Sequence, residues 1–302
     1  MSGKSLKNWI VTARPHTLTL ALSCAGMGII AAANSGYYNL KITIFSLLTA
    51  LLLQILSNVA NDYGDFKHGT DNHNRKGPKR ALQKGDLSPK QIKTAIILLA
   101  ALSFISGIFL LIFAFSNIRM SGLIILLIAG ILAIWAAIAY TAAKNPYGYK
   151  GFGDFFVFIF FGLFAVAGTF FLHSGIFRFI ALLPAASIGF LSVAVLNLNN
   201  LRDIDNDKIS GKITLAVRLG YKNTVIYQTI LIVLAFFSMF IYNFIENNHK
   251  IFLLQTLPFL LLFPSLIRLF SVLEAQKLYG ELKKLSLIIL LIVFFQLMNL
   301  IF

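Results

Sequence analysis

Nine apolar segments, each about as long as a bilayer is thick, dominate this sequence of 302 residues. A helix needs about 20 predominantly apolar residues to cross the hydrocarbon core of a membrane. The segments cover residues 17–34, 40–61, 94–116, 121–142, 155–173, 179–200, 223–244, 251–272 and 284–302. Since only 12% of the residues are charged, a soluble protein of this size could not cover its surface. The sequence predicts an all-α, polytopic membrane bundle of about nine transmembrane helices, built as a single domain over residues 1–302.

The basic residues fall on alternate connections between the apolar segments. If the N-terminus is placed in the cytoplasm, 22 of the 26 lysines and arginines lie on the cytoplasmic side. The four on the other side are Lys41, Arg119, Arg178 and Lys250. The positive-inside rule therefore predicts a multi-pass protein of the cytoplasmic (inner) membrane, with the N-terminus inside and the C-terminus outside. Because the net charge of +15 follows this topology, it does not indicate a nucleic-acid partner. All acidic residues except Glu246 share the cytoplasmic side, so we expect the active face there.

Two acidic, asparagine-flanked clusters lie at the cytoplasmic ends of the second and sixth apolar segments. They cover residues 58–65 and 199–207. Each contains a pair of aspartates three or four positions apart, which share one face of a helix. Carboxylates are costly beside a bilayer unless a cation holds them, and Mg²⁺ commonly bridges carboxylates to substrate phosphates. The pattern predicts a metal–diphosphate site. The candidate metal ligands are Asp62, Asp65, Asp71, Asp203 and Asp207.

Amide and basic side chains in the same regions are candidates for binding the substrate. They are Arg14, Asn58, Asn61, Lys67, Lys79, Arg80, Lys144, Asn200, Arg202 and Lys212. Tyr140 and Tyr149 lie between the fourth and fifth spans, where their rings could stabilise a developing carbocation. Membership of an interfacial aromatic belt is the alternative for both tyrosines. Asp86 and Asp205 are interpreted as a helix cap and a solvated residue.

The two longest connections have a similar order of residue types. Residues 62–93 and 201–222 both run from asparagine-rich helix ends through aspartates into glycine and basic residues, four helices apart. This predicts a weak internal duplication that relates helices 1–4 to helices 5–8, with two half-sites facing a central cavity. The alternative is a general preference of interfacial loops for polar and basic residues.

At these residues the chain resembles the UbiA superfamily of intramembrane prenyltransferases. That family is described by an Asn-Asp-x-x-Asp-x-x-x-Asp motif and a second Asp-x-x-Asp-x-x-x-Asp motif. The first motif matches through Asp65, but Gly69 stands at its last position. In the second motif, Asn200 replaces the leading aspartate. Both departures resemble the branch that prenylates 1,4-dihydroxy-2-naphthoate, as do residues 13–15 and 211–220.

The resemblance implies a helical bundle around a central, lipid-open cavity with polar cytoplasmic cap loops. It implies Mg²⁺-dependent transfer of a polyprenyl group from a polyprenyl diphosphate to 1,4-dihydroxy-2-naphthoate. Diphosphate and CO₂ would leave, and the product would be demethylmenaquinone, a precursor in menaquinone biosynthesis. Another aromatic acceptor such as 4-hydroxybenzoate is the alternative within the family.

Two functions from outside the family are less consistent with the sequence. A membrane transporter would carry its charged groups near the midplane of the bilayer, whereas here they lie at helix ends. The compact aspartate motif of a CDP-alcohol phosphotransferase is absent from the sequence. In the favoured interpretation the catalytic residues are Asp62, Asp65, Asp203, Asp207, Tyr140 and Tyr149.

Overall fold

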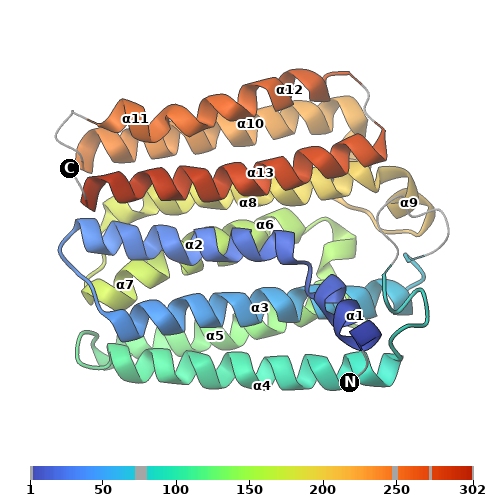
Figure 1. Ribbon diagram of the computed structural model, residues 1–302, viewed down its shortest axis with the longest axis horizontal. Helices are drawn as coiled ribbons and strands as arrows, with labels where there is room; N and C mark the ends of the chain where they lie inside the picture. Colours follow the sequence, from blue (N-terminus) through green and yellow to red (C-terminus); the bar gives the residue numbers. More distant parts are fainter. Residues whose placement is uncertain (1–2, 72–79, 247–250, 272–273, 301–302) are drawn as a thin grey trace.

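The computed structural model describes residues 3–71, 80–246, 251–271 and 274–300, and helices make up nearly all of them (Figure 1). The long helices lie side by side along one direction. Their bounds are α1 Gly3–Ala13, α2 Pro15–Asn34, α3 Leu40–Lys67, α4 Pro89–Ala114, α5 Met120–Ala139, α6 Gly153–Val157, η2 Phe158–Gly168, α7 Thr169–Ser174, α8 Leu182–Arg202, α9 Ile204–Ile209, α10 Leu215–Glu246, α11 Phe252–Thr256, η4 Leu257–Leu262, α12 Phe263–Leu269 and α13 Ala275–Gln296. Short turns η1 (Tyr147–Lys150), η3 (Phe179–Ala181) and η5 (Leu297–Leu300) complete the described elements.

The prediction of about nine transmembrane helices is confirmed. Within the described residues, eight helical segments are long and apolar enough to cross a membrane. α13 lies alongside them as a ninth long helix (Figure 1). Its first turns carry Lys277, Glu281, Lys283 and Lys284, which shorten its apolar stretch.

The helical stretches of α3 and α10 extend beyond the apolar segments from which they were predicted. α3 continues from the predicted end at residue 61 to Lys67. α10 has a short helical stretch from Leu215, which a kink at Gly220 (φ 72°, ψ 169°) separates from the long helix predicted from residue 223. Hydropathy detects only the part of a helix that faces lipid, whereas backbone hydrogen bonding continues into the polar turns. As a result, the first acidic cluster lies on the last turns of a transmembrane helix.

The polarity of surface and interior is inverted relative to a soluble protein. Large apolar side chains face outward, for example Ile97 at 69% and Ile112 at 57% exposure on α4. Polar side chains lie inside, with Asn58 and Asp62 each at 2% exposure. This distribution suits a bundle in lipid, because polar groups must find partners inside the protein.

α8 occupies the middle of the bundle. It packs against α2, α10, α13 and η2, while α3 packs against α2, α4 and α5. The short helices α1 and α9 lie at the same end of the bundle, on the right in Figure 1. α3 and α8 both terminate at that end, which is called the polar end below.

One helix crossing is unusually close. η2 is a π-helical stretch, and at its crossing with α8 the glycines Gly162 and Gly189 face each other. A Cβ atom added to Gly162 would lie 2.7 Å from both the carbonyl oxygen of Ala185 and the Cα of Gly189. Small residues at such a crossing allow two membrane helices to approach backbone to backbone.

We expect Gly162→Ala to destabilise the fold by about 1–3 kcal/mol, because the added methyl group meets backbone atoms that cannot move separately. Gly107→Ala on α4 is the matched control, since nothing lies within 4 Å of its added Cβ. The control should be neutral or raise the melting temperature, as alanine favours helix. Thermal unfolding in detergent measures both, and equal Tm values for the two variants would contradict the close crossing.

Candidate active site

A cavity of about 560 Å³ runs inward from the polar end, and both acidic clusters line it. Its walls come from α2, α3, α5, η2, α8 and α13. At the far end it is lined by apolar side chains, among them Leu110, Leu126 and Leu172. Phenylalanines 160, 161 and 164 of η2 form one side of the apolar part. A single cavity thus combines a charged mouth with a long apolar interior.

Arg80 gathers the first acidic cluster. Its Nη1 lies 3.2 Å from Oδ1 of Asp62, 2.9 Å from Oδ2 of Asp65 and 3.2 Å from Oδ2 of Asp71. The same nitrogen donates a 3.0 Å hydrogen bond to the carbonyl oxygen of Asn61. Three carboxylates therefore converge on one point, which a buried guanidinium occupies.

The chain beyond α3 folds back to bring Asp71 to this point. Gly69 adopts a left-handed conformation, with φ of 74°, and the backbone N–H of Asp71 donates to the carbonyl oxygen of Asp65 at 3.2 Å. Glycine takes this conformation without the steric cost that a Cβ would add. The glycine at the last motif position thus explains how an aspartate two residues later joins the cluster.

Arg14 approaches the first cluster from the opposite side and forms an ion pair with Asp62. Arg14 lies between α1 and α2 and has a positive φ of 51°. A non-glycine residue in this region is uncommon and costs conformational energy. The strained junction directs α1 away from the axis of α2 and leaves the guanidinium beside the carboxylate.

The second cluster lies across the cavity, at the end of α8. Arg202 donates from Nε to Oδ1 of Asp203 at 3.0 Å and from Nη2 to Oδ1 of Asn199 at 2.9 Å. Nζ of Lys212 lies 3.6 Å from Oδ1 of Asp207. Asp203 and Asp207 thus each have a basic side chain beside them.

Hydrogen bonds join the two clusters. The hydroxyl of Tyr149 donates to Oδ1 of Asp65 at 2.9 Å and lies 2.7 Å from the hydroxyl of Thr70. The amide of Asn206 donates to the carbonyl oxygen of Thr70 at 2.9 Å. The loop after α3 is therefore attached directly to α9, which follows the second cluster.

Arg80 and Lys212 remain charged at neutral pH. Burial opposes the charge on Arg80, but the three surrounding aspartates outweigh it and raise the pKa of its guanidinium. The same balance of burial against Asp207 and Asp65 raises the pKa of Lys212. Burial raises the pKa of Asp207 to about 6, although Lys212 favours its ionised form. The second cluster therefore gains from any further positive charge that reaches it.

The two candidate tyrosines are neutral phenols. Burial raises the pKa of Tyr140 to about 12, and burial together with Asp65 raises the pKa of Tyr149. Neither hydroxyl can serve as a base near pH 7. The ring of Tyr140 lines the cavity and packs on Gly148, where an added Cβ would lie 2.5 Å from Cε2 of the ring. Glycine at 148 leaves the space that this ring needs.

The acidic residues fit a hard divalent cation. Three carboxylates already converge at Arg80, and Oδ2 of Asp207 and Oδ1 of Asn206 are buried without a hydrogen-bond partner in the described part of the chain. These are oxygen donors, which Mg²⁺ prefers. No group of three acidic, histidine or cysteine side chains is arranged as a finished metal site among the described residues, since arginines hold the carboxylates.

The structure brings most of the predicted site residues to one cavity. Those that line it are Arg14, Asn58, Asn61, Asp62, Asp65, Arg80, Tyr140, Arg202, Asp203, Asp207 and Lys212. Asp71 and Tyr149 stand behind this layer and contact it through Arg80 and Asp65. Asn200 is buried at 3% exposure outside the lining.

Two predicted lysines are not brought to the cavity. Lys67 and Lys144 are exposed and do not line it. Lys67 lies two positions after Asp65 on α3, which turns it to the opposite face of the helix. Lys79 lies outside the described residues.

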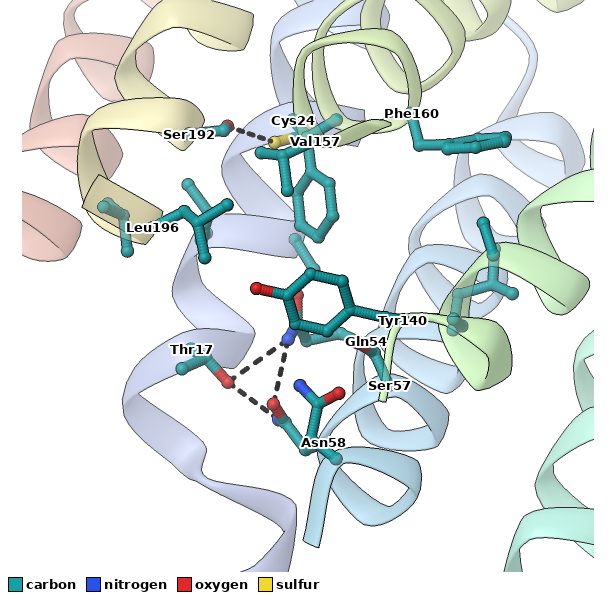
Figure 2. A pocket seen from close by; sticks show the side chains of 18 of the residues that line it. Thr17, Cys24, Gln54, Ser57, Asn58, Tyr140, Val157, Phe160, Ser192 and Leu196 are labelled. Atoms are coloured by element: carbon teal, nitrogen blue, oxygen red, sulfur yellow. Dashed lines mark hydrogen bonds between the residues drawn. The ribbon is translucent and has the colours of Figure 1, made fainter. Parts of the chain in front are cut away.

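Other residues that line the cavity were not predicted from the sequence. Thr17 and Gln54 join Asn58 in a hydrogen-bonded group on the cavity wall (Figure 2). Tyr279 of α13 also lines the cavity, beside His16. Spacing could have revealed Gln54, because it precedes Asn58 by four residues on the face of α3 that ends in the acidic cluster.

Comparison with known proteins identifies the fold family. The sequence profile of the UbiA prenyltransferase family matches residues 21–293. The chain belongs to this family. The apo structure of a UbiA homologue from Aeropyrum pernix K1 superposes with a TM-score of 0.68 at 17% identity, covering 95% of this chain and 98% of that one. A UbiA homologue from Archaeoglobus fulgidus bound to GPP and Mg²⁺ has a TM-score of 0.64 at 14% identity, covering 98% and 100%.

Curated members of the family are more similar in sequence. The 1,4-dihydroxy-2-naphthoate octaprenyltransferase of Haemophilus influenzae is 47% identical over 237 residues, which cover 78% of this chain and 76% of that protein. The Escherichia coli enzyme of the same name is 41% identical over 237 residues, covering 77% and 76%. The resemblance predicted from the motifs is confirmed for the family.

We expect Arg80→Met to cost about 3–5 kcal/mol of stability, because it leaves buried carboxylates without their shared cation. Arg268→Met is the control: that arginine is 44% exposed, and Lys284 still lies 3.3 Å from its partner Glu281. Because Arg268 is largely exposed and Lys284 still pairs with the buried Glu281, this variant should lose only about 1 kcal/mol. Denaturant unfolding in detergent compares the two variants, and equal losses would show that Arg80 does not hold the cluster together.

Proposed function

We propose that this protein transfers a polyprenyl group from a polyprenyl diphosphate to 1,4-dihydroxy-2-naphthoate, releasing diphosphate and CO₂ and forming demethylmenaquinol, the reduced form of demethylmenaquinone. The observation that carries the proposal is the single cavity with both acidic clusters at its mouth and an apolar interior. Such a cavity accommodates a molecule with a highly charged head and a long hydrocarbon tail. The names of the curated relatives support the same acceptor.

The charged mouth would hold the diphosphate. Asp62, Asp65, Asp203 and Asp207 would bind Mg²⁺, which neutralises negative charge on the departing diphosphate. Basic side chains already at the mouth, Arg80, Arg202 and Lys212, supply donors for the remaining phosphate oxygens. Fixed positive groups aimed at the charge that develops as the allylic C–O bond breaks lower the barrier.

The cavity wall near the mouth suits the reacting carbon atoms. The neutral ring of Tyr140 presents a π face, which stabilises a developing allylic cation without capturing it as a phenolate would. The electron-rich naphthoate ring then attacks the allylic carbon. Loss of the carboxylate as CO₂ restores the aromatic ring. The isoprenoid tail lies against the phenylalanines of η2 and the leucines at the far end.

We also propose that the polar end faces the cytoplasm and that residues 1–302 act as one prenyltransferase domain. The excess of basic residues on the polar side supports this orientation. The two acidic clusters end α3 and α8, helices at matching places in the two halves, which is consistent with an internal duplication.

We expect Asp203→Asn to lower prenyl transfer by about 10²-fold or more, because it removes negative charge from the metal–diphosphate site. Asp205→Asn is the matched control, since Asp205 is exposed and does not line the cavity. Mass spectrometry of the quinol formed from hydroxynaphthoate and hydroxybenzoate acceptors measures the activity. Full activity of folded Asp203→Asn, or a product formed only from 4-hydroxybenzoate, would contradict the proposal. Chelation of divalent cations should reproduce the loss in the unaltered protein.

The orientation is tested by labelling single cysteines in a Cys24→Ala background. Asp86→Cys lies at the polar end and Ser116→Cys in the connection between α4 and α5 at the other end, and both positions are exposed. In sealed right-side-out vesicles, an impermeant maleimide should label only the cysteine at position 116. Labelling of position 86 alone would reverse the proposed topology.

A further inference from the structure

Three polar side chains form a closed group on the cavity wall, next to the junction of α1 and α2 (Figure 2). The amide nitrogen of Asn58 donates at 2.8 Å to the carbonyl oxygen of Ala13 and at 2.8 Å to Oγ1 of Thr17. Nε2 of Gln54 lies 3.2 Å from Oδ1 of Asn58 and 3.5 Å from Oγ1 of Thr17. The hydroxyl of Thr17 donates to the carbonyl oxygen of Arg14 at 2.9 Å.

The donors and acceptors of this group can be assigned in only one way. A backbone carbonyl accepts and never donates, so the atom of Asn58 beside Ala13 is its nitrogen. Oδ1 of Asn58 then faces Gln54 and requires a donor, which must be Nε2. The Thr17 hydroxyl has given its proton to Arg14 and accepts from both amides. The chain of assignments leaves Oε1 of Gln54 as the remaining acceptor.

That oxygen has no partner within the described part of the protein. Oε1 of Gln54 is buried and makes no hydrogen bond to the described residues, and Gln54 as a whole is 8% exposed. Gln54 lines the cavity. Since buried polar atoms are nearly always satisfied, an acceptor left open on a cavity wall indicates a ligand that brings a donor.

The position of Gln54 limits which ligands could bring that donor. It lies eight residues before Asp62 on the same face of α3, which corresponds to about 12 Å along the helix axis. A prenyl diphosphate brings acceptor oxygens to the mouth and a hydrocarbon tail to the interior, and neither part donates. The hydroxyl groups of an aromatic acceptor are the donors available among the proposed substrates.

We propose that Oε1 of Gln54 accepts a hydrogen bond from a ring hydroxyl of the aromatic acceptor and thereby selects hydroxylated rings. This inference rests on the proposed prenyl transfer and adds a specificity-determining residue to it. The hydrogen bond orients the ring at the wall that Tyr140 shares and draws the hydroxyl proton toward the protein. Electron density on the ring rises, which favours attack on an electrophilic carbon.

The test compares Gln54→Met with the unaltered protein. Methionine is similar in size but accepts hydrogen bonds only weakly. The KM for the hydroxynaphthoate should rise about tenfold, the difference expected for one hydrogen bond, while the KM for the prenyl diphosphate stays within about twofold. Equal changes in both KM values would indicate a purely structural role and overturn the proposal.

Competitive inhibition by matched analogues tests the hydroxyl directly. The unaltered protein should bind 4-hydroxy-2-naphthoate about tenfold more tightly than 4-methoxy-2-naphthoate, and Gln54→Met should bind the two about equally. Gln228→Met is the matched control, because Gln228 is a buried glutamine that bonds to Asn197 away from the cavity. It should keep the preference for the hydroxyl.

The outcomes separate this inference from the proposed function. A preference that survives in Gln54→Met, or one that is absent from the unaltered protein because Gln54 meets only water, overturns the role of Gln54 while prenyl transfer stands. If the unaltered protein prenylates no hydroxynaphthoate, the proposed function fails and the inference fails with it.

Discussion

The neutralisation of buried carboxylates by shared cations is the interaction on which this structure depends. Asp62, Asp65, Asp203 and Asp207 are buried, so each one needs a positive partner inside the protein. Arg80 supplies that partner for three aspartates at once and ties the loop after α3 to the end of the helix. Ion pairs between these aspartates and basic side chains hold the arrangement together. A metal ion and a diphosphate bring both signs of charge to the same place, so they could replace these ion pairs without a change of fold.

The same constraint divides the cavity into two parts. Ionisable groups gather at the polar end, where α1, α9 and the loops lie. The interior is lined mainly by alanine, leucine and phenylalanine, with a few neutral polar side chains such as Gln54 and Ser192. One cavity thus offers a charged environment that suits a diphosphate and an apolar environment that suits an isoprenoid chain. The close crossing of η2 and α8 at Gly162 and Gly189 holds the wall formed by η2 in place, since two backbones in contact leave little freedom to move.

The sequence was sufficient to predict the helices and the acidic clusters, because hydropathy and i, i+4 spacing are local properties. Which basic side chain pairs with which aspartate depends on contacts between residues that are far apart in the sequence. Arg80 reaches Asp71 only because Gly69 turns the chain back, and no periodic pattern contains that turn. Lys67 shared a loop with the aspartates in sequence, but the helix continues through it and turns it outward. Proximity in sequence therefore predicted the cluster but did not separate Arg80, which pairs with it, from Lys67, which faces outward.

Gln54 illustrates a second limit of sequence analysis. Its residue type and spacing place it on the functional face of α3, yet neither reveals which of its two polar atoms is free. That depends on Ala13, whose carbonyl oxygen is available to Asn58 because the strained backbone at Arg14 ends α1 there. The helix junction thus fixes the orientation of Asn58, which leaves Oε1 of Gln54 without a partner among the described residues. Ion pairing and acceptor recognition depend on the same junction, because Arg14 also holds Asp62. The conformation of a single residue therefore couples the charged mouth to the wall where the aromatic ring is proposed to bind.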